Sequence, residues 1–357
     1  MTDEWTKQIF DLKNRVDKLE QERDELNRAV HELYQINNEL VKHMGQTFEN
    51  MTTLDMNQNL TRVRCENLRY EITDPRDERT DYFFPQIRSC EETVQEILQN
   101  RVSMARFGDG EFSCIRKMER HKFQTVNEKL ADRLEEVLHS RHPKLLIAIA
   151  DNYGALDQFT ESAANAIRFY MVGGETRKQH MELLERERVY YNAYVTRPYV
   201  MYQDVGTDAP KRRFERLKEI WRGRNVVLIE GAQTRMGVGN DLLEHAGEVK
   251  RILAPVTNAF DQYENLLDCA LAYAKQDTLF LIAVGPCAGV LAYDLTCKGY
   301  QALDIGHLDL EYEWFLAGQG ERVAVPYKYN NEVEGDDCAA ELVDPVYQKQ
   351  IIADYSY

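Results

Sequence analysis

The sequence predicts an α/β protein, with a Rossmann-like, doubly wound domain whose sheet is mostly parallel, preceded by an N-terminal α-helical coiled coil. Two observations predict this arrangement. Leucines recur in a heptad pattern over the first 48 residues, and from about residue 91 short apolar runs alternate with helical patterns. Strands that alternate with helices form parallel sheets that are covered on both faces.

Residues 1–48 carry the heptad repeat. Position d holds leucine from Leu12 to Leu40, and position a holds β-branched residues such as Val16 and Val30. This combination favours a parallel two-stranded coiled coil, and the polar Asn37 at an a position is of the kind that fixes register. We therefore expect self-association into a dimer. The alternative is a single amphipathic helix that lies on the rest of the protein.

Three segments of different composition follow the heptads. Residues 49–84 are polar and contain turn formers such as Asp74-Pro75, so they predict an irregular connector. Residues 85–330 contain all the predicted strands and predict a single domain, long enough to bury a sizeable core. Residues 331–357 are acidic and predict a C-terminal tail.

The strands predicted within residues 85–330 are short and apolar. They span residues 102–107, 144–150, 225–229, 249–254, 278–284 and 301–305. Helical patterns occupy residues 93–100, 127–140, 155–195, 210–222, 259–274 and 288–298. The alternation indicates a sheet with helices on both sides.

The net charge argues against some classes of binding partner, and the cysteine pattern indicates the cellular compartment. The formal net charge of −16 argues against broad binding to nucleic acid or to an anionic membrane surface. No run of about 18 apolar residues predicts an integral membrane segment, and no signal peptide is visible. The seven cysteines are scattered without a CxxC pair, which is typical of free thiols in a reducing cytoplasm. We expect a cytoplasmic protein.

Glycines and polar residues follow the predicted strands. Gly108 begins the segment after the first strand, and Asp151 and Asn152 follow the second. Gly285 and Pro286 follow a later strand. In doubly wound sheets ligands bind beyond the carboxyl ends of the strands, so these positions predict a binding site.

The segment at residues 106–111 (RFGDGE) places Asp109 and Glu111 two residues apart in a glycine-rich turn. Two such carboxylates can bind one hard cation, Mg²⁺ or Mn²⁺, and leave positions open for diphosphate oxygens. A metal there would neutralise the charge on a departing nucleoside diphosphate. The alternative is that Asp109 only caps the helix that follows.

Residues 306–314 (GHLDLEYEW) alternate polar and apolar side chains. If this segment is extended, His307, Asp309, Glu311 and Glu313 share one face, since strand side chains alternate. These groups could supply a metal ligand and a general base. The alternative is an amphipathic edge strand with a solvated acidic face.

Residues 230–241 (EGAQTRMGVGND) form a glycine-rich loop between a strand and an expected helix. Backbone amides at a helix N-terminus can hold phosphate, and Arg235 can pair with it in a bidentate manner. The loop matches neither a GxGxxG fingerprint nor a Walker motif. A plain strand-to-helix connection is the alternative.

In this order the motifs resemble the GT-D fold glycosyltransferases, a bacterial family first catalogued as a domain of unknown function. The resemblance covers about residues 85–325. Its blocks are residues 106–111, 237–242 (GVGNDL), 285–286 (GP), 291–295 (LAYDL) and 304–314 (DIGHLDLEYEW).

The resemblance implies a catalytic domain that transfers a hexose from a UDP-sugar to a hydroxyl of a glycan or glycoconjugate. It implies Mn²⁺ or Mg²⁺ bound at Asp109 and Glu111, and His307 beside the metal and the diphosphate. Asp309 and Glu311 become candidate bases on the acceptor side. The residues expected to bind the nucleotide sugar are Arg106, Gly108, Asp151, Asn152, Arg235, Gly239, Asn240, Gly285, Pro286 and His307. The rival hypothesis is a non-catalytic coiled-coil scaffold or sensor that binds a nucleotide sugar.

Overall fold

The computed structural model describes residues 2–72, 83–119, 124–172, 175–330, 332–333 and 339–357. The chain divides into two compact units, Met1–Cys65 and Glu66–Tyr357. No helix within the described ranges combines the length and the apolar character that spanning a bilayer requires.

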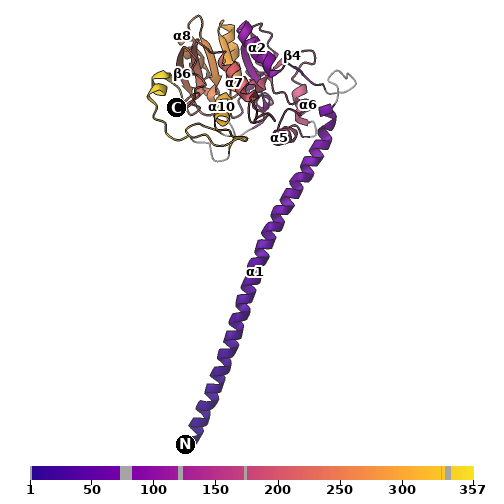
Figure 1. The fold of residues 1–357 in the computed structure, drawn as a ribbon, viewed down its shortest axis with the longest axis vertical. Coiled ribbons are helices and arrows are strands. Elements are labelled where there is room, and N and C mark those ends of the chain that lie inside the picture. Colours follow the sequence, from indigo (N-terminus) through magenta and orange to yellow (C-terminus); the bar gives the residue numbers. More distant parts are fainter. Residues whose placement is uncertain (1, 73–82, 120–123, 173–174, 331, 334–338) are drawn as a thin grey trace. The chain divides into compact units, whose positions relative to one another are not determined.

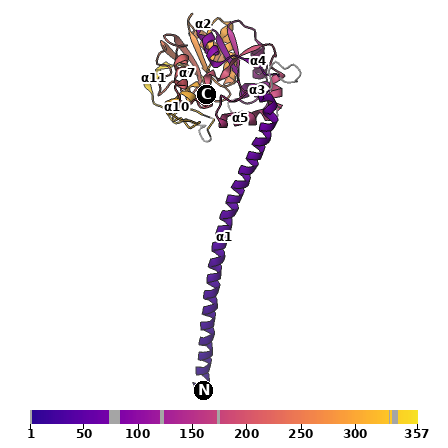
Figure 2. The ribbon, with the colours of Figure 1, turned by 45° about the vertical axis from the view of Figure 1, so that its right-hand side comes forward.

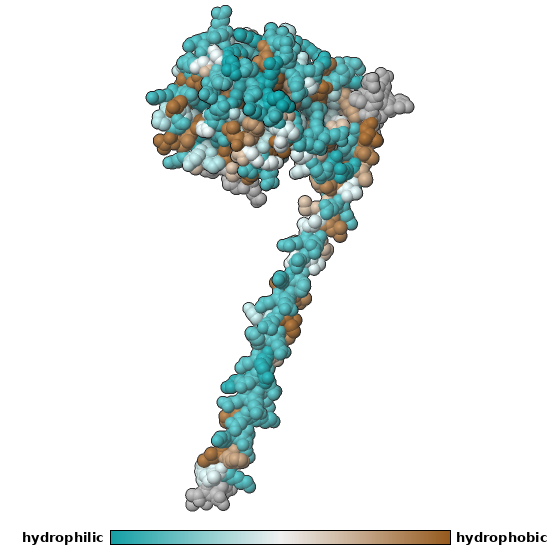
Figure 3. All heavy atoms as spheres, viewed as in Figure 1, coloured by the Kyte–Doolittle hydropathy of each residue, from teal (hydrophilic) through white to brown (hydrophobic). Residues whose placement is uncertain are grey.

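The predicted N-terminal helix is confirmed as α1 (Thr2–Ile72), which is unbroken in Figures 1 and 2. It is longer than expected, since residues 49–72 continue the helix where the sequence predicts an irregular connector. The reason is that residues 46–72 contain neither glycine nor proline, so no residue there opposes the helix strongly. The rest of the expected connector falls largely on residues 73–82, outside the described residues. Figure 3 shows apolar side chains exposed along α1.

The second unit contains a sheet in which the nine strands of the described residues are all parallel. Their order is β1-β4-β3-β2-β8-β7-β5-β6-β9. The strands are β1 (Gln86–Ile87), β2 (Ser103–Phe107), β3 (Leu145–Ile149), β4 (Val189–Asn192), β5 (Asn225–Gly231), β6 (Glu248–Ala254), β7 (Leu279–Ala283), β8 (Gln301–Asp304) and β9 (Ile351–Asp354). The prediction of a doubly wound α/β domain is confirmed. Figure 1 shows β6 and β4 towards opposite edges of this sheet.

Helices connect the strands along the chain. They are α2 (Cys90–Asn100), α3 (Asp109–Ile115), α4 (Glu128–His139), α5 (Glu161–Met171), α6 (Glu175–Met181), α7 (Ala209–Lys218), α8 (Tyr263–Tyr273), α9 (Cys287–Cys297), α10 (Leu308–Leu316) and α11 (Pro345–Gln350). There are also two short 3₁₀ helices among the described residues, η2 (Ala193–Thr196) and η3 (Ala259–Gln262).

Alternate residues of the central strands face two separate cores. In β5, Val226 and Leu228 belong to one apolar cluster, which also contains residues of α7 and α10. Val227 and Ile229 belong to the other, which contains residues of α8 and α9. Because strand side chains point alternately to opposite faces and both faces are covered, the central strands are largely apolar, and β3 and β7 are apolar throughout.

The expectation that residues 306–314 are extended is wrong. Residues 308–316 form α10, and His307 is its N-cap. Gly306 turns the chain between β8 and this helix, with a φ of +43°. The alternation of polar and apolar residues misleads here because α10 is buried on several sides, so it lacks the amphipathic period of a surface helix.

Two further segments differ from expectation. Residues 232–247 run from β5 to β6 through successive turns, so the helix N-terminus expected after the glycine-rich loop is absent from this fully described segment. The residues expected to form an acidic tail instead contribute α11 and β9, and β9 pairs with β6 at the edge of the sheet.

Candidate active site

A cavity of about 490 Å³ lies at the carboxyl ends of the strands. Its lining includes residues that lie within two positions of the ends of β2, β3, β7 and β8. From β2 the chain proceeds through β3 towards β4 on one side, while β8 and β7 lie on the other. The cavity is therefore at the topological switch point of the sheet, where ligands bind in this class of fold.

The turn from β2 into α3 brings Asp109 and Glu111 to the cavity wall. Gly108 is extended and acts as the N-cap, and its backbone N–H donates to Glu111 Oε2 at 2.8 Å. Asp109 is exposed in the first turn of α3. Burial, with the nearby charge of Asp304, raises the pKa of Glu111 to about 7. The two carboxylates therefore line the same cavity, as the sequence predicts.

These carboxylates fit a divalent cation that has few protein ligands. No cluster of three or more His, Cys, Asp or Glu side chains suited to a metal occurs in the described part of the chain. Those residues therefore do not form a metal site in which His, Cys, Asp and Glu side chains supply every ligand. Mg²⁺ is commonly bound by one or two carboxylates together with waters and substrate phosphates, and Asp109 with Glu111 matches that donor set.

Arg106 extends from β2 to the base of the cavity, where its guanidinium is held by several contacts. Nη2 donates to Asp304 Oδ1 at 2.6 Å, Nε donates to the Asp304 carbonyl at 3.0 Å, and Nη1 donates to Thr196 Oγ1 at 2.9 Å. Asp304 is buried. A Cβ at Gly306 would lie 2.0 Å from Arg106 Nη2, so only glycine leaves room for this guanidinium.

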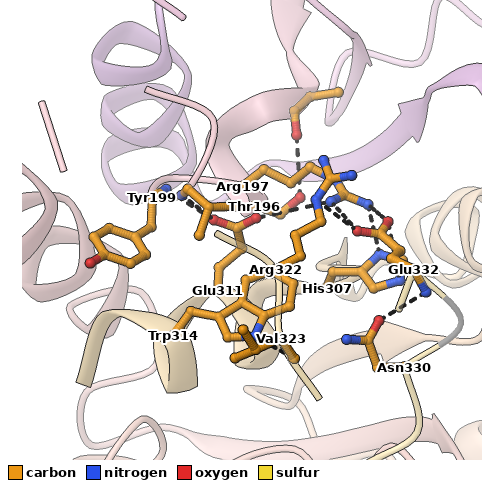
Figure 4. A network of polar contacts seen from close by, with 12 residues as sticks. Thr196, Arg197, Tyr199, His307, Glu311, Trp314, Arg322, Val323, Asn330 and Glu332 are labelled. Carbon is orange, nitrogen blue, oxygen red and sulfur yellow. Dashed lines mark hydrogen bonds and ion pairs between the residues drawn. The ribbon is translucent and has the colours of Figure 1, made fainter. Parts of the chain in front are cut away.

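A second charged cluster lies on another part of the cavity wall, around Arg197, Glu332 and His307 (Figure 4). Both terminal nitrogens of Arg197 donate to the carboxylate of Glu332, with Nη1 at 3.0 Å from Oε2. Burial opposes ionisation of Glu332, but the Arg197 guanidinium outweighs burial and holds the pKa of this carboxyl well below its usual range. The pair is therefore charged at neutral pH.

His307 is neutral in this cluster and accepts a hydrogen bond from Arg197. Its Nδ1 lies 3.1 Å from Arg197 Nη2, and because a guanidinium only donates, Nδ1 must accept and the ring proton must be on Nε2. Burial lowers the pKa of His307 to about 4. Nε2 lies 3.8 Å from Glu332 Oε1.

Glu311 on α10 holds the backbone that carries Arg197. Its Oε2 accepts the N–H groups of Tyr199 at 3.0 Å and Val200 at 3.1 Å. Its Oε1 lies 3.9 Å from Arg197 Nη1 and has no hydrogen-bond partner among the described residues. The side chain is fully buried, and burial raises the pKa of Glu311 to about 7.

Asp309 lines the cavity but all its hydrogen bonds are directed into the protein. Oδ1 accepts from the backbone N–H of Gly237 and from Asn240 Nδ2, both at 2.9 Å, and Oδ2 accepts from Lys328 Nζ at 2.6 Å. Lys328 Nζ also donates to Glu313 Oε1 at 2.6 Å. This network ties α10 to the glycine-rich loop.

The predicted site residues divide into two groups. Those that line the cavity are Arg106, Gly108, Asp109, Glu111, Asn152, Gly285, Pro286, His307 and Asp309. Those outside the described lining are Asp151, Arg235, Gly239, Asn240 and Glu311. Arg235 donates instead to the carbonyls of Tyr327 and Ala340, both at 2.7 Å.

Neither Arg197 nor Glu332 is predicted from the sequence. They are 135 positions apart, and no local motif marks either of them. A third unnamed residue, Arg322, also lines the cavity, and its Nε lies 3.3 Å from Glu332 Oε2. Only the fold brings the three together.

Comparison with known sequences gives a consistent result. The family model described as glycosyltransferase GT-D fold matches residues 104–333. A probable glycosyl transferase, Gly, of Streptococcus gordonii is 32% identical over 271 residues, which cover 75% of this chain and 38% of that protein. Glycosyltransferase GlyD of Streptococcus pneumoniae serotype 4 is 33% identical over 271 residues, which cover 75% of this chain and 32% of that protein. The chain thus matches about a third of the length of these curated relatives.

Solved structures agree. One, described as the highly conserved domain of unknown function 1792 with a distinct glycosyltransferase fold, has a TM-score of 0.71 and 33% identity. The match covers 76% of this chain and 96% of that one. Another, a new glycosyltransferase of the same domain family from Streptococcus sanguinis, has a TM-score of 0.68 and 30% identity, over 76% of this chain and 99% of the other.

Proposed function

The chain belongs to the glycosyltransferase GT-D fold family, and from this premise we propose that it transfers a hexose from a UDP-sugar to a hydroxyl group of a glycan or glycoconjugate. The observation that carries the proposal is the cavity at the switch point of the sheet. It combines two carboxylates suited to a cation with arginines suited to phosphate, and both are needed for a nucleoside diphosphate sugar.

Asp109 and Glu111 would hold Mg²⁺ or Mn²⁺, which when bound supplies positive charge to the diphosphate leaving group. The chain's own residues provide the rest. Gly285 and Pro286 place the N-terminal end of α9 at the cavity, where the helix dipole favours an anion. Fixed charges of this kind stabilise developing negative charge without reorganisation.

The acceptor must also be oriented, and a proton must leave its hydroxyl. Of the two candidate bases, Asp309 lines the cavity, whereas Glu311 is fully buried behind Arg197. Three of the four lone-pair positions of the Asp309 carboxylate already accept hydrogen bonds, from Lys328, Asn240 and the Gly237 amide, so a proton from the acceptor would have to bind the remaining position on Oδ2. His307, neutral and protonated on Nε2, is suited to donate a hydrogen bond rather than to act as the base.

Turnover of a panel of UDP-sugars tests this proposal and separates it from the sensor hypothesis. The assay is release of UDP, with and without Mn²⁺ and with sugar acceptors present. Asp109→Asn and Glu111→Gln should abolish release, while Asp157→Asn, an exposed carboxylate outside the described lining, should leave it unchanged. UDP binding with no turnover of any donor would favour the sensor.

For α1 we propose pairing with a second copy of the chain. The a and d side chains are exposed along the helix, including Val16, Leu26 and Leu33. The heptad register continues beyond residue 48, since Met51 and Leu54 occupy the next a and d positions and are also exposed. In a parallel pair, Arg15 at position g would face Glu20 at position e of the second copy, with opposite charge.

Light scattering measures this self-association. Leu26→Lys, at a d position, should convert dimer into monomer, because it places charges in the seam. Met56→Lys is the matched control, since Met56 is exposed to a similar degree on the same helix but lies at position f, away from the seam. A monomeric wild type would refute the pairing.

A further inference from the structure

One carboxylate in the cavity is surrounded by cationic groups and hydrogen-bond donors. Glu332 accepts from both terminal nitrogens of Arg197, lies 3.3 Å from Arg322 Nε and has His307 Nε2 at 3.8 Å (Figure 4). All four residues line the cavity described above. This arrangement is a built anion site that a side chain of the protein itself fills.

The geometry of the site suits phosphate as well as carboxylate. A guanidinium presents paired N–H donors that match the oxygens of either group in the same bidentate way. Glu311 positions Arg197. Its Oε2 accepts the backbone N–H groups of Tyr199 and Val200, and its Oε1 lies 3.9 Å from Arg197 Nη1. The Arg197 guanidinium is therefore held in place before any ligand binds.

We infer that Arg197 and Arg322 bind the diphosphate of the donor, and that the carboxylate of Glu332 occupies their site until the diphosphate displaces it. The inference rests on the proposed function, since it assigns part of that donor site. The inference goes beyond the proposed function because it identifies a competitor for the donor within the protein itself, the carboxylate of Glu332.

Exchange is favourable for electrostatic reasons. A diphosphate carries more negative charge and more acceptor oxygens than one carboxylate, so it can accept more hydrogen bonds from the two guanidinium groups. When the site holds no ligand, Glu332 neutralises Arg197, which is mostly buried and would otherwise be an uncompensated charge. The same contact must be broken before the donor binds, which weakens the measured affinity.

Calorimetric titration of inorganic pyrophosphate and of UDP into the full chain tests the inference. Glu332→Gln removes the competing charge and should tighten binding of both probes about ten-fold, equivalent to about 1.4 kcal/mol. Glu341→Gln is the matched control, an exposed carboxylate in the same part of the chain, and should bind like wild type. In an Arg197→Gln background the gain from Glu332→Gln should disappear.

The outcomes separate this inference from the proposed function. If UDP binds the wild type but a folded Glu332→Gln variant binds neither probe more tightly, the competitor idea is overturned and the donor site stands. If pyrophosphate binding tightens but UDP does not bind, the anion site stands and the UDP-sugar proposal fails. Should Arg197→Gln not fold, the more exposed Arg322→Gln replaces it and should weaken binding of pyrophosphate several-fold. Unchanged affinity in that variant would contradict the assignment.

Discussion

Substitution of Gly306 by alanine should be one of the most damaging small changes in the α/β domain. The added Cβ would lie 2.0 Å from Arg106 Nη2 and 2.7 Å from its Cζ, so the guanidinium must move. Moving it breaks the 2.6 Å ion pair with Asp304, which is 2% exposed and cannot find water instead.

The magnitude follows from two terms. A non-glycine residue in the left-handed region costs about 1 kcal/mol, and the φ of Gly306 is +43°. Breaking a buried ion pair typically costs about 3–5 kcal/mol, because the remaining carboxylate is left without its partner. Gly306→Ala should therefore lower the free energy of unfolding by about 4–6 kcal/mol.

Gly318→Ala provides the control for backbone strain alone. Gly318 also has a positive φ, +65°, but a Cβ there would meet no atom within 4 Å. Its replacement should cost only about 1 kcal/mol. Urea unfolding followed by near-ultraviolet circular dichroism, which reports on the buried Trp221 and Trp314, measures both variants. Equal destabilisation by the two substitutions would refute the role assigned to Arg106 and Asp304.

Three further predictions concern stability and activity. Burial raises the pKa of Glu311 to about 7 from 4.5, so the folded state holds this proton more tightly than the unfolded state. As pH rises from about 5 to 7, the free energy of unfolding of the wild type should fall relative to that of Glu311→Gln by up to about 1.4 kcal/mol per pH unit. Urea unfolding at a series of pH values measures both free energies, and the same pH dependence in the two proteins would contradict this prediction. Lys328→Met leaves Asp309 and Glu313 without their shared cation and should cost about 3–5 kcal/mol in the same unfolding assay, and a loss below 1 kcal/mol would show that the network is dispensable. Deletion of residues 1–48 should abolish self-association but leave UDP release with a small acceptor largely intact; a large loss of turnover in the folded truncation would show that pairing is needed for catalysis.

The parts of the fold that sequence could predict are those with a strong local period. The leucine heptads indicate α1, and the continuous apolar runs indicate β3, β5 and β7, because both faces of the sheet are buried. Asp109 and Glu111 could be assigned to one site because they are two residues apart and directly follow β2.

Other features have no local signal. The segment after Gly306 alternates like a strand, yet it is a helix in which two acidic residues are also buried, Glu311 bound to backbone amides and Asp309 to Lys328. Strand order places β2 beside β8, about 200 residues later in the chain, and no short pattern encodes that pairing. Arg197 and Glu332 meet for the same reason, through the fold and not through a motif.

Donor binding at the carboxylate pair is the central claim, and calorimetric titration of UDP with and without Mn²⁺ tests it most directly. We predict that Mn²⁺ strengthens UDP binding to the wild type, that the Asp109→Asn/Glu111→Gln double variant loses this dependence, and that Asp157→Asn retains it. UDP binding that is absent, or that is indifferent to Mn²⁺ and to both carboxylates in folded proteins, would contradict the claim.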